Sequence, residues 1–336
     1  MSRQGAPASS SYPSQLTLGF ADTTPDCPHG RASRLPKPGP RIISASKRTD
    51  IPAAYLDWMI ERCDVGWVDV PNPLFHRHPD PLRALTHVSL LPEHVRAIVW
   101  WSKSYAVYRS RFRELERYPR QYFHFTINPR REDVRWLEPD VPSLDECLEQ
   151  LRFLSGLPGG PSMVAWRYDP ICFWLEGGEP RSSWDPAFFE RMCRELSVIG
   201  VTTCYTSLAD RYPRYEQRVR RFFPAYRLRD PEPEEIGNLL TAMGECARAY
   251  GMRLFSCSER ALVREGICEK GACIDGSRFG GTTRDATDRK MRRRGECGCT
   301  LHTDVGDYSE HECTFSCVYC YANPSHRRFR VSAAPA

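Results

Sequence analysis

The sequence predicts an α/β fold: a TIM-like (βα) barrel, complete or partial, followed by a cysteine-rich C-terminal segment. Three observations lead to this prediction. Short runs rich in β-branched and aromatic residues alternate with amphipathic stretches, polar residues follow these runs, and cysteines become dense from Cys257 onward. Strand–helix alternation of this kind is typical of βα units and a parallel sheet. An open sheet is the alternative, because the evidence for closure is indirect.

The expected elements follow one another from Arg41. Strands are expected at Arg41–Ser46, Gly66–Val70, Ala97–Ser102, Tyr122–Ile127, Met163–Tyr168, Val201–Ser207 and Met252–Cys257. Helices are expected at Ala53–Arg62, Leu144–Ser155, Ala187–Ile199 and Pro233–Tyr250. This number of strands in one continuous stretch suits a barrel better than an open three-layer sheet.

Composition sets the boundaries of the chain's parts. Residues 1–40 are rich in Pro and Ser without a sustained period, so we expect a disordered leader. The barrel is expected over 41–260, the cysteine-rich segment over 261–326 and a basic tail over 327–336.

Compartment and charge narrow the class of protein. No run approaches the roughly 20 apolar residues that a membrane helix needs, and the N-terminus has no secretory pattern. The 15 cysteines of the 336-residue chain therefore indicate a reducing, cytoplasmic location rather than a disulfide framework. The net charge of +5 is mild, but basic residues gather at Arg278–Arg294 and after the last cysteine. Such runs suit a nucleic acid, although a solvated basic face is their commoner meaning.

Polar residues at the strand ends form the first candidate site. In a parallel barrel they would meet at the C-terminal mouth, where active sites of this fold lie. The catalytic candidates are Arg48, Asp50, Lys103, Arg167 and Asp169, with Asn72, Thr126, Asn128, Ser207, Asp210 and Tyr212 nearby. Polar loops explain any one of these residues, but the set, with its two Arg–Asp couples, indicates a shared site.

The cysteines fall into two classes. Isolated cysteines among apolar residues are expected to fill the core: Cys63, Cys147, Cys172, Cys193, Cys204 and Cys246. The later ones are denser than packing requires, which predicts metal binding: Cys257, Cys268, Cys273, Cys297, Cys299, Cys313, Cys317 and Cys320.

Cys313, Cys317 and Cys320 have the spacing C-x3-C-x2-C on one short loop. Three thiolates so placed can each bind a different iron of a [4Fe–4S] cluster and leave one iron open to an external molecule. Alternatively, Cys297 or Cys299 supplies a fourth ligand, which would make the cluster an ordinary electron carrier.

A second site is expected from Cys257, Cys273, Cys297 and Cys299. Four thiolates suffice for a closed second [4Fe–4S] cluster or for a structural zinc ion. The C-x-C spacing of the last two is tighter than a usual zinc knuckle and favours iron–sulfur. Cys268 has no assigned role.

Two further motifs are given structural interpretations. Gly177-Gly178-Glu179-Pro180 resembles a segment that contacts the cofactor in some iron–sulfur enzymes, but a hairpin turn would contain the same residues. His76-Arg77-His78 resembles a metal motif, but an exposed loop after Asn72-Pro73 explains it better.

Several short sequence motifs occur in a fixed order along the chain: Ala45–Pro52, Arg167–Pro170, Cys273–Asp275, Cys297–Cys299, Asp304–Tyr308 and Cys317–Asn323. In these motifs, and over about Arg41 to Pro324, the chain resembles the domain of unknown function family 1848 (DUF1848). This is a bacterial family whose members look like permuted radical S-adenosylmethionine (SAM) proteins. Two positions depart from the expected pattern, Lys47 in place of arginine and Ser316 in place of glycine.

The resemblance implies a radical SAM enzyme. Its cluster would be bound by Cys313, Cys317 and Cys320, with Tyr319 near the adenine of SAM and Asn323 in the same cofactor-binding motif. A flavodoxin- or ferredoxin-like donor would supply electrons, if needed through the second site, to act on an unknown substrate. The first alternative is a nucleic-acid-acting protein whose cysteines hold zinc or a structural cluster. The second is a plain electron-transfer protein, for which so many polar strand ends are excessive.

Overall fold

The computed structural model describes residues 40–72, 84–257, 259–280 and 297–322. By its contacts the chain divides into Met1–Lys37 and Pro38–Ala336, and all described residues belong to the second unit. Several sequence predictions concern residues outside these ranges: the leader up to residue 39, His76–His78, most of the basic run Arg278–Arg294, Asn323 and the basic tail.

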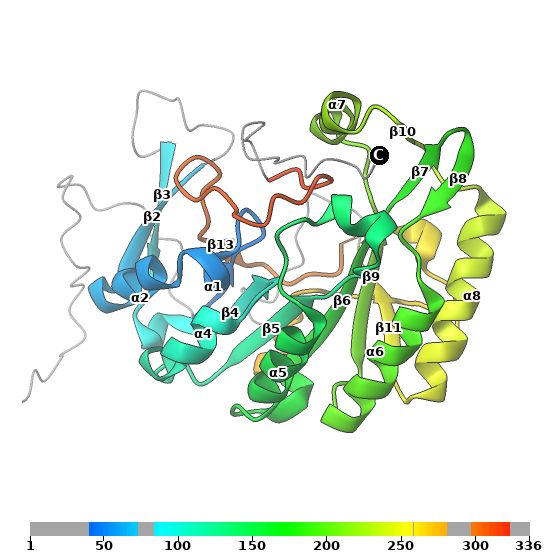
Figure 1. Cartoon of the computed structure of the whole chain (residues 1–336). Helices are drawn as coiled ribbons and strands as arrows, with labels where there is room; N and C mark the ends of the chain where they lie inside the picture. The colour runs from blue at the N-terminus through cyan, green and yellow to red at the C-terminus, as the bar shows by residue number, and fades with distance from the viewer. Residues whose placement is uncertain (1–39, 73–83, 258, 281–296, 323–336) are drawn as a thin grey trace, which may run out of the picture. The chain divides into compact units, whose positions relative to one another are not determined.

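The fold is α/β and is built on an eight-stranded sheet in the order β12-β11-β9-β6-β5-β4-β1-β13 (Figure 1). Its strands are β1 (Arg41–Ala45), β4 (Val95–Ser102), β5 (Gln121–Thr126), β6 (Val164–Ile171), β9 (Thr203–Leu208), β11 (Arg253–Ser256), β12 (Glu269–Lys270) and β13 (Thr303–Asp304). Every neighbouring pair is parallel. Within the described residues, β12 and β13 form the two edges, so the sheet is consistent with a partial barrel but is not closed.

Helices follow most of the strands, and most of them cover one face of the sheet. The helices are α1 (Ile51–Ala54), α2 (Leu56–Val65), α4 (Ala106–Arg111), α5 (Leu144–Ser155), α6 (Pro186–Ile199), α7 (Pro213–Phe222) and α8 (Pro233–Ala249). Helix α7 instead packs against the segments that contain Trp174 and Leu228. Short 3-10 turns lie at Pro92–His94, Phe112–Leu115, Glu132–Leu137, Gly160–Met163, Arg260–Leu262 and Gly276–Phe279. Outward-facing strand residues such as Trp100, Phe123 and Trp166 pack against helix residues such as Leu151 and Leu240 in the main core.

Local sequence signals explain where the long helices begin and end. The Ser143 and Glu146 side chains form a capping box at the start of α5, which satisfies amides that no helical carbonyl can reach. Asp185 caps α6, and Gly200 ends it in a left-handed conformation that glycine adopts without strain. The expected α5, α6 and α8 are confirmed to within one residue at each end.

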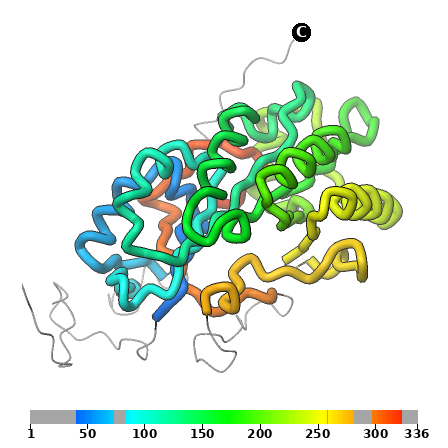
Figure 2. The backbone as a smooth tube through the Cα atoms, turned by 90° about the horizontal axis from the view of Figure 1, so that it is seen from below, coloured from blue at the N-terminus to red at the C-terminus, as the bar shows by residue number. Residues whose placement is uncertain are grey.

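The opposite face of the sheet is covered by the C-terminal chain rather than by helices. Residues 259–280 and 297–304, here called the strap, lie across it (Figure 2). Strap residues Ile274 and Phe279 pack against inward-facing Tyr122, Tyr205 and Phe255 in a second core cluster. The strap therefore occupies the side of the sheet that would be the lumen of a closed barrel.

One predicted strand lies outside the main sheet. The segment expected at Gly66–Val70 forms β2 (Trp67–Pro71), but it pairs antiparallel with β3 (Leu85–Ser89) in a separate two-stranded sheet. Its alternating burial is typical of a half-buried hairpin, whereas a central parallel strand is buried on both faces. Asn72 therefore does not follow a strand of the parallel sheet.

A second small sheet explains the glycine pair. β7 (Phe173–Glu176), β8 (Glu179–Ser182) and β10 (Tyr226–Leu228) form an antiparallel sheet in the order β10-β7-β8. Gly177 and Gly178 connect β7 to β8 and both have positive φ, as a two-residue hairpin turn requires. The Gly-Gly-Glu-Pro segment is thus an exposed hairpin. Among the described residues, no helix has the length and apolarity needed to cross a membrane.

Candidate metal centres at the C-terminal edge of the sheet

Asp50 and Lys103 meet where β1 and β4 end. Asp50 begins α1, and its carboxylate accepts hydrogen bonds from Ser102 Oγ (2.7 Å), the Lys103 amide (2.9 Å) and the Ala53 amide (3.1 Å). Burial raises the pKa of Asp50 to about 6 although these hydrogen bonds oppose the shift. Two predicted site residues are thus in contact, because the backbone amide of Lys103 donates to the carboxylate of Asp50.

The ammonium group of Lys103 reaches a buried carboxylate that sequence analysis missed. Lys103 Nζ lies 2.8 Å from Glu138 Oε1, which also accepts from Asn128 Nδ2 (2.6 Å) and from the Tyr319 hydroxyl. Although burial alone would raise it, the charge of Lys103 together with these hydrogen bonds holds the pKa of Glu138 below its usual value. Tyr319 is therefore tied to the strand ends by a charged network.

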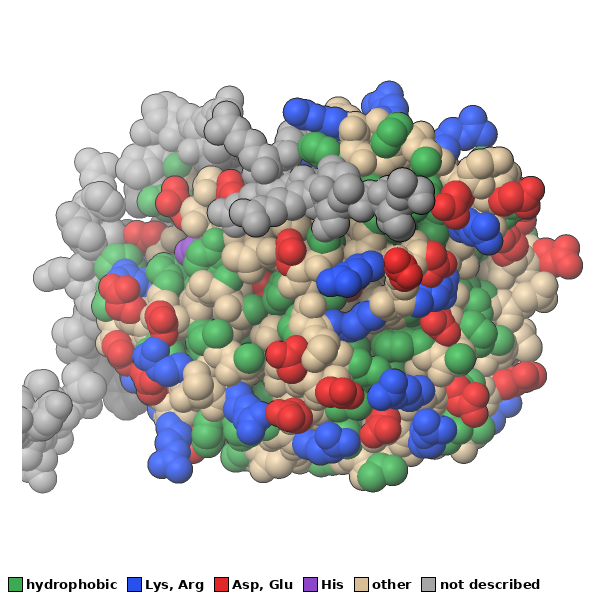
Figure 3. Space-filling model, viewed as in Figure 1, with side chains coloured by type: hydrophobic (Ala, Val, Ile, Leu, Met, Phe, Trp, Pro, Cys, Tyr) green, Lys and Arg blue, Asp and Glu red, His purple; other side chains and the backbone are tan. Residues whose placement is uncertain are grey.

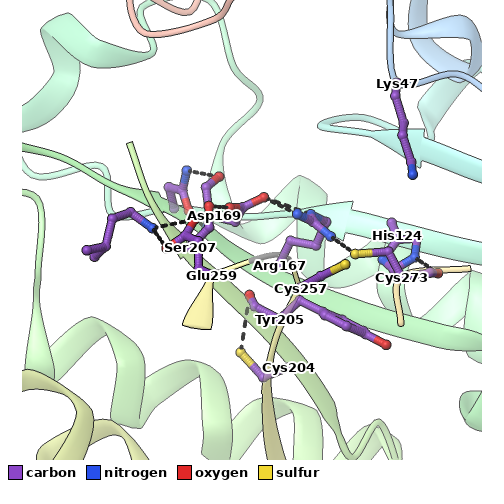
Figure 4. A network of polar contacts seen from close by, with 12 residues as sticks. Lys47, His124, Arg167, Asp169, Cys204, Tyr205, Ser207, Cys257, Glu259 and Cys273 are labelled. Carbon is purple, nitrogen blue, oxygen red and sulfur yellow. Dashed lines mark hydrogen bonds and ion pairs between the residues drawn. The ribbon is translucent and has the colours of Figure 1, made fainter. Parts of the chain in front are cut away.

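Arg167 and Asp169 form the second network, at the ends of β6 and β9 (Figure 4). The Arg167 guanidinium pairs with the Asp169 carboxylate, which also accepts from the Ser207 hydroxyl. Arg167 Nη1 donates to the Sγ of Cys273 at 3.4 Å. The predicted Arg–Asp couple at this position is present, and it faces a cysteine of the strap.

Three of the four cysteines expected to form a second site come together in the structure, and the fourth, Cys273, lies beside them. The sulfur atoms of Cys257, Cys297 and Cys299 all lie within 4.8 Å of one another, and the Cys257 and Cys299 sulfurs are 3.8 Å apart. Cys273 is in hydrogen-bond contact with Cys257 and Cys299. These contacts lower the pKa of Cys273 well below its usual value, and the positive charges of Arg167 and Lys47 act in the same direction. We call this group the four-thiol site; thiols are the ligands that structural zinc ions and iron–sulfur clusters use.

Cys313, Cys317 and Cys320 lie on a separate loop, here called the three-cysteine loop (residues 313–320). Burial raises the pKa of Cys313 to about 12 and that of Cys317 well above its usual value. The groups that act most on Cys317 after burial are Lys103, Glu138 and the other two cysteines of the loop. A bound metal would offset the cost of ionising these buried thiols, because a coordinating thiol is deprotonated by the metal's charge.

Backbone contacts fix the shape of the three-cysteine loop. Arg218 of α7, which is 1% exposed, donates to the carbonyls of Val318 (2.8 Å) and Cys320 (2.6 Å). The Val318 amide donates to the Leu137 carbonyl at 3.0 Å. Ser316 has a φ of 51°, a left-handed conformation that glycine adopts more readily. The serine at the position where glycine is expected therefore occupies a backbone conformation suited to glycine.

Arg48, the remaining catalytic candidate, holds the chain between the two cysteine groups. Its Nη1 donates to the Gly306 carbonyl at 3.0 Å, and its guanidinium lies over the Tyr308 ring. Asp304 of β13 accepts from Ser44 Oγ (2.8 Å), Ser46 Oγ (2.6 Å) and the Lys47 amide (2.8 Å). The Asp304 contacts fix β13 against the end of β1. The contacts of Arg48 fix the residues that follow β13, so the role of Arg48 in this structure is structural.

A cleft of about 490 Å³ adjoins the start of the three-cysteine loop. It is lined by aromatic side chains, including Trp58 and Trp67, and by Asp69, Glu310 and His311. His311 precedes Cys313 and lies against the rings of Tyr55 and Trp58, at centroid distances of 4.7 and 4.2 Å. The volume of the cleft is within the usual range of small-molecule sites.

Comparison with protein-family models identifies the family of the chain. Residues 42–322 match the model of a family described as Domain of unknown function (DUF1848). The chain belongs to this family. No curated protein and no solved structure matches the sequence. The matched residues include the parallel sheet, the strap and both cysteine groups of this DUF1848 domain.

The structure brings most of the predicted site residues to one edge of the sheet, in two networks. Asp50 and Lys103 lie with the three-cysteine loop, and Arg167 and Asp169 lie with the four-thiol site. Sequence analysis missed Glu138, which directly follows a 3-10 turn, and Arg218, which lies in an amphipathic helix; neither is at a strand end. In the sequence, the signal for Arg218 is its position on the helix face formed by Tyr215, Val219 and Phe222, which are spaced as one side of a helix.

Proposed function

We propose that this DUF1848 protein is a radical SAM enzyme whose [4Fe–4S] cluster is held by Cys313, Cys317 and Cys320. The observation that supports the proposal most is the mutual contact of Cys257, Cys297 and Cys299. Because Cys297 and Cys299 are engaged with each other and with Cys257, neither supplies the fourth ligand of the three-cysteine loop. A cluster on that loop would then keep one iron open.

The surroundings of the loop suit an anionic cluster. Lys103 places a buried positive charge near Cys317, and Arg218 directs its guanidinium at the loop's carbonyl groups. Both cations offset the negative charge that three thiolates would bring into a low-dielectric interior. Tyr319 donates to Glu138 and so fastens the loop at the residue before Cys320.

When bound and reduced, such a cluster supplies one electron to cleave SAM to a 5′-deoxyadenosyl radical that abstracts hydrogen from a substrate. The protein's own residues would position the reactants and exclude water. The cleft beside His311 offers room for a small molecule, and Asp50, with a pKa of about 6, is able to exchange a proton near neutral pH. A flavodoxin- or ferredoxin-like protein is the proposed electron donor.

Anaerobic reconstitution tests the proposal. The reduced protein should give an electron paramagnetic resonance signal of a [4Fe–4S] cluster that changes on adding SAM, and 5′-deoxyadenosine should form. Cys317→Ala should abolish both results. Cys172→Ala is the matched control, because Cys172 is buried and packs in the same core cluster as Val318. A signal unaffected by SAM in the wild-type protein would contradict the proposal.

The nucleic-acid alternative has less support. Among the described residues of the face shown in Figure 3, acidic and basic side chains are interspersed and form no basic stripe for a phosphate backbone. The alternative predicts salt-dependent binding without any effect of SAM on the bound metal. The same reconstitution, repeated with and without a DNA duplex, distinguishes the two functions.

A further inference from the structure

We infer that Cys257, Cys273, Cys297 and Cys299 bind a single tetrahedral Zn²⁺ ion, which fastens the strap across the inner face of the sheet. The inference goes beyond the proposed function, because it concerns a different site and a different metal. It also departs from the sequence expectation, in which the C-x-C spacing favoured a second iron–sulfur cluster.

Sulfur–sulfur distances distinguish a single ion from a cluster. Zinc–thiolate bonds are about 2.3 Å long, so tetrahedral geometry separates two ligand sulfurs by about 3.8 Å. The Cys257 and Cys299 sulfurs are 3.8 Å apart, and the Cys297 sulfur lies within 4.8 Å of both. A [4Fe–4S] cluster needs wider spacing, because each thiolate binds a different iron at a different corner of the cube. The spacing of Cys257 and Cys299 is that of two ligands on one atom, Cys297 is close enough to be a third, and Cys273, which contacts Cys257 and Cys299, is the fourth ligand that we infer.

The remaining donors around the site suit a tetrathiolate centre. Four thiolates and one Zn²⁺ carry a net charge of −2, and the thiols that are protonated beforehand release their protons when the metal binds. The Arg167 guanidinium donates to Cys273 Sγ at 3.4 Å, and the Ile274 amide donates to Cys299 Sγ at 3.5 Å. Contacts of this kind orient metal ligands and offset their charge. Lys47 lies over the Trp101 ring, and Arg167 lies over the same ring, so a second cation faces the same region.

The backbone around the ligands is built for a close approach. Gly298 separates Cys297 from Cys299, and a Cβ atom on it would lie 3.0 Å from the Gly271 carbonyl oxygen. Any other residue would push the C-x-C segment away from the chain that carries Cys273. Glycine therefore allows the two segments of the strap to lie close enough for their thiols to approach one another.

The position of the site explains why a metal there would be structural. Cys257 follows β11, Cys273 follows the edge strand β12, and Cys299 precedes β13 at the opposite edge. One ion bound by all of them joins chain segments that belong to the two edges of the sheet. In addition, Tyr205 donates to the Ala272 carbonyl at 2.8 Å, so the strap is held from the sheet side as well. The ion would thus close the open sheet through ligands rather than through strand pairing.

Metal analysis of the full-length protein tests the inference. We expect about one zinc per chain, in addition to the iron of the three-cysteine loop. Cys299→Ala should reduce bound zinc at least tenfold and leave iron in reconstituted protein unchanged, whereas Cys317→Ala should do the reverse. Cys268→Ala is the control, because Cys268 is buried in the same segment and, within the part of the chain that the structure describes, contacts neither cysteine group. It should retain both metals.

A second measurement does not depend on a variant that folds. Wild-type protein loaded with Co²⁺ in place of zinc should show the strong visible bands of a tetrahedral tetrathiolate site. Finding about four additional irons per chain that depend on Cys299, with no zinc, would overturn the inference in favour of a second cluster. A single iron in place of zinc would also overturn it. None of these outcomes depends on SAM cleavage, so failure of the proposed function and failure of this inference remain distinguishable.

Discussion

The four-thiol site takes its cysteines from three separate places in the chain, whereas the three-cysteine loop contains all of its cysteines within residues 313–320. The first group is brought together by the sheet, since its members follow β11 and β12 and precede β13. The second group is brought together by its own short sequence and is shaped by contacts from α7 and the chain after β5. A metal at the first site joins distant segments, while a metal at the second adds to a loop that is already fixed.

The charged surroundings of the two groups differ as well. The three-cysteine loop lies beside a buried network of Lys103, Glu138 and Asp50. The four-thiol site has Arg167, whose charge is shared with Asp169 outside the group. Changes to buried charges near Lys103 should therefore act on the loop and leave the four-thiol site intact. The following predictions test this separation.

The largest effect is expected from breaking the Lys103–Glu138 pair. Lys103→Met leaves the buried Glu138 carboxylate without its cation and should lower the free energy of unfolding by about 4 kcal/mol. It should also reduce iron retained by the three-cysteine loop, while zinc stays bound. Urea unfolding and metal analysis provide the measurements.

The double variant Lys103→Met/Glu138→Gln provides the control for this pair. It removes both charges and keeps an oxygen that Tyr319 and Asn128 can donate to, so most of the lost stability should return. If the single variant lost zinc and iron equally, the two cysteine groups would not be independent.

A pH dependence should come from Asp50, on the loop side of the molecule. Burial raises its pKa to about 6 in the folded state, above the 3.8 of the exposed group. The folded state therefore binds this proton more tightly, and its contribution to stability is fully present below pH 3.8 and is lost as the pH rises through 6. The shift of roughly two units corresponds to about 3 kcal/mol. Urea unfolding from pH 4 to pH 7 should show this loss relative to Asp50→Asn, because all other groups titrate in both proteins.

An unfolding free energy that followed the same pH curve in both proteins would show that Asp50 does not carry this shift. The comparison with Asp50→Asn is needed because protonation of thiolate ligands destabilises the protein at low pH and acts in the opposite direction. Zinc content should be the same in both proteins at pH 7.

Much of the fold follows from local patterns. The strand and helix segments around β1, β4, β5, β6, α5, α6 and α8 were predicted because each has a period and composition that its own sequence determines. β2 was predicted as a strand, but its place in the sheet was wrong. Strand order depends on which edge a segment pairs with, and the alternating burial typical of a hairpin strand is visible for β2 only in the structure. The edge strand β13 spans only Thr303–Asp304, too short for any period.

The candidate sites were predictable to the extent that chemistry is visible in residue type. Thiols and charged residues at strand ends could be identified, and the contact among Cys257, Cys297 and Cys299 agrees with the expected second site. Glu138 and Arg218 could not, because their roles come from tertiary contacts with Lys103 and with the carbonyls of the loop. The catalytic and cofactor-binding roles of Arg48, Asp50, Lys103, Arg167, Asp169 and Tyr319 stay predictions.

A smaller effect, on both groups, is expected from Asp304, which lies between them in the chain. Asp304→Asn removes the charge and turns an amide donor toward Ser44, Ser46 and the Lys47 amide, which all donate to the carboxylate. Hydrogen bonds to charged groups contribute about 1.5–3 kcal/mol, so we expect a loss of about 2 kcal/mol in urea unfolding. Because β13 follows Cys299 and leads to the loop, bound zinc and bound iron should both decrease. Loss of one metal alone would assign Asp304 to a single group.

The smallest effect should come from Ser316, and it should be a gain. Its φ of 51° costs a residue with a side chain about 1–2 kcal/mol, whereas glycine adopts this conformation freely but loses more entropy on folding. Ser316→Gly should therefore stabilise the protein by about 0.5–1 kcal/mol, measured by urea unfolding, and leave zinc unchanged. Ser316→Ala separates the backbone effect from loss of the hydroxyl, because alanine keeps the strain and should give no gain. A gain with alanine equal to that with glycine would mean that the hydroxyl, and not the left-handed backbone of the three-cysteine loop, is the source of the cost.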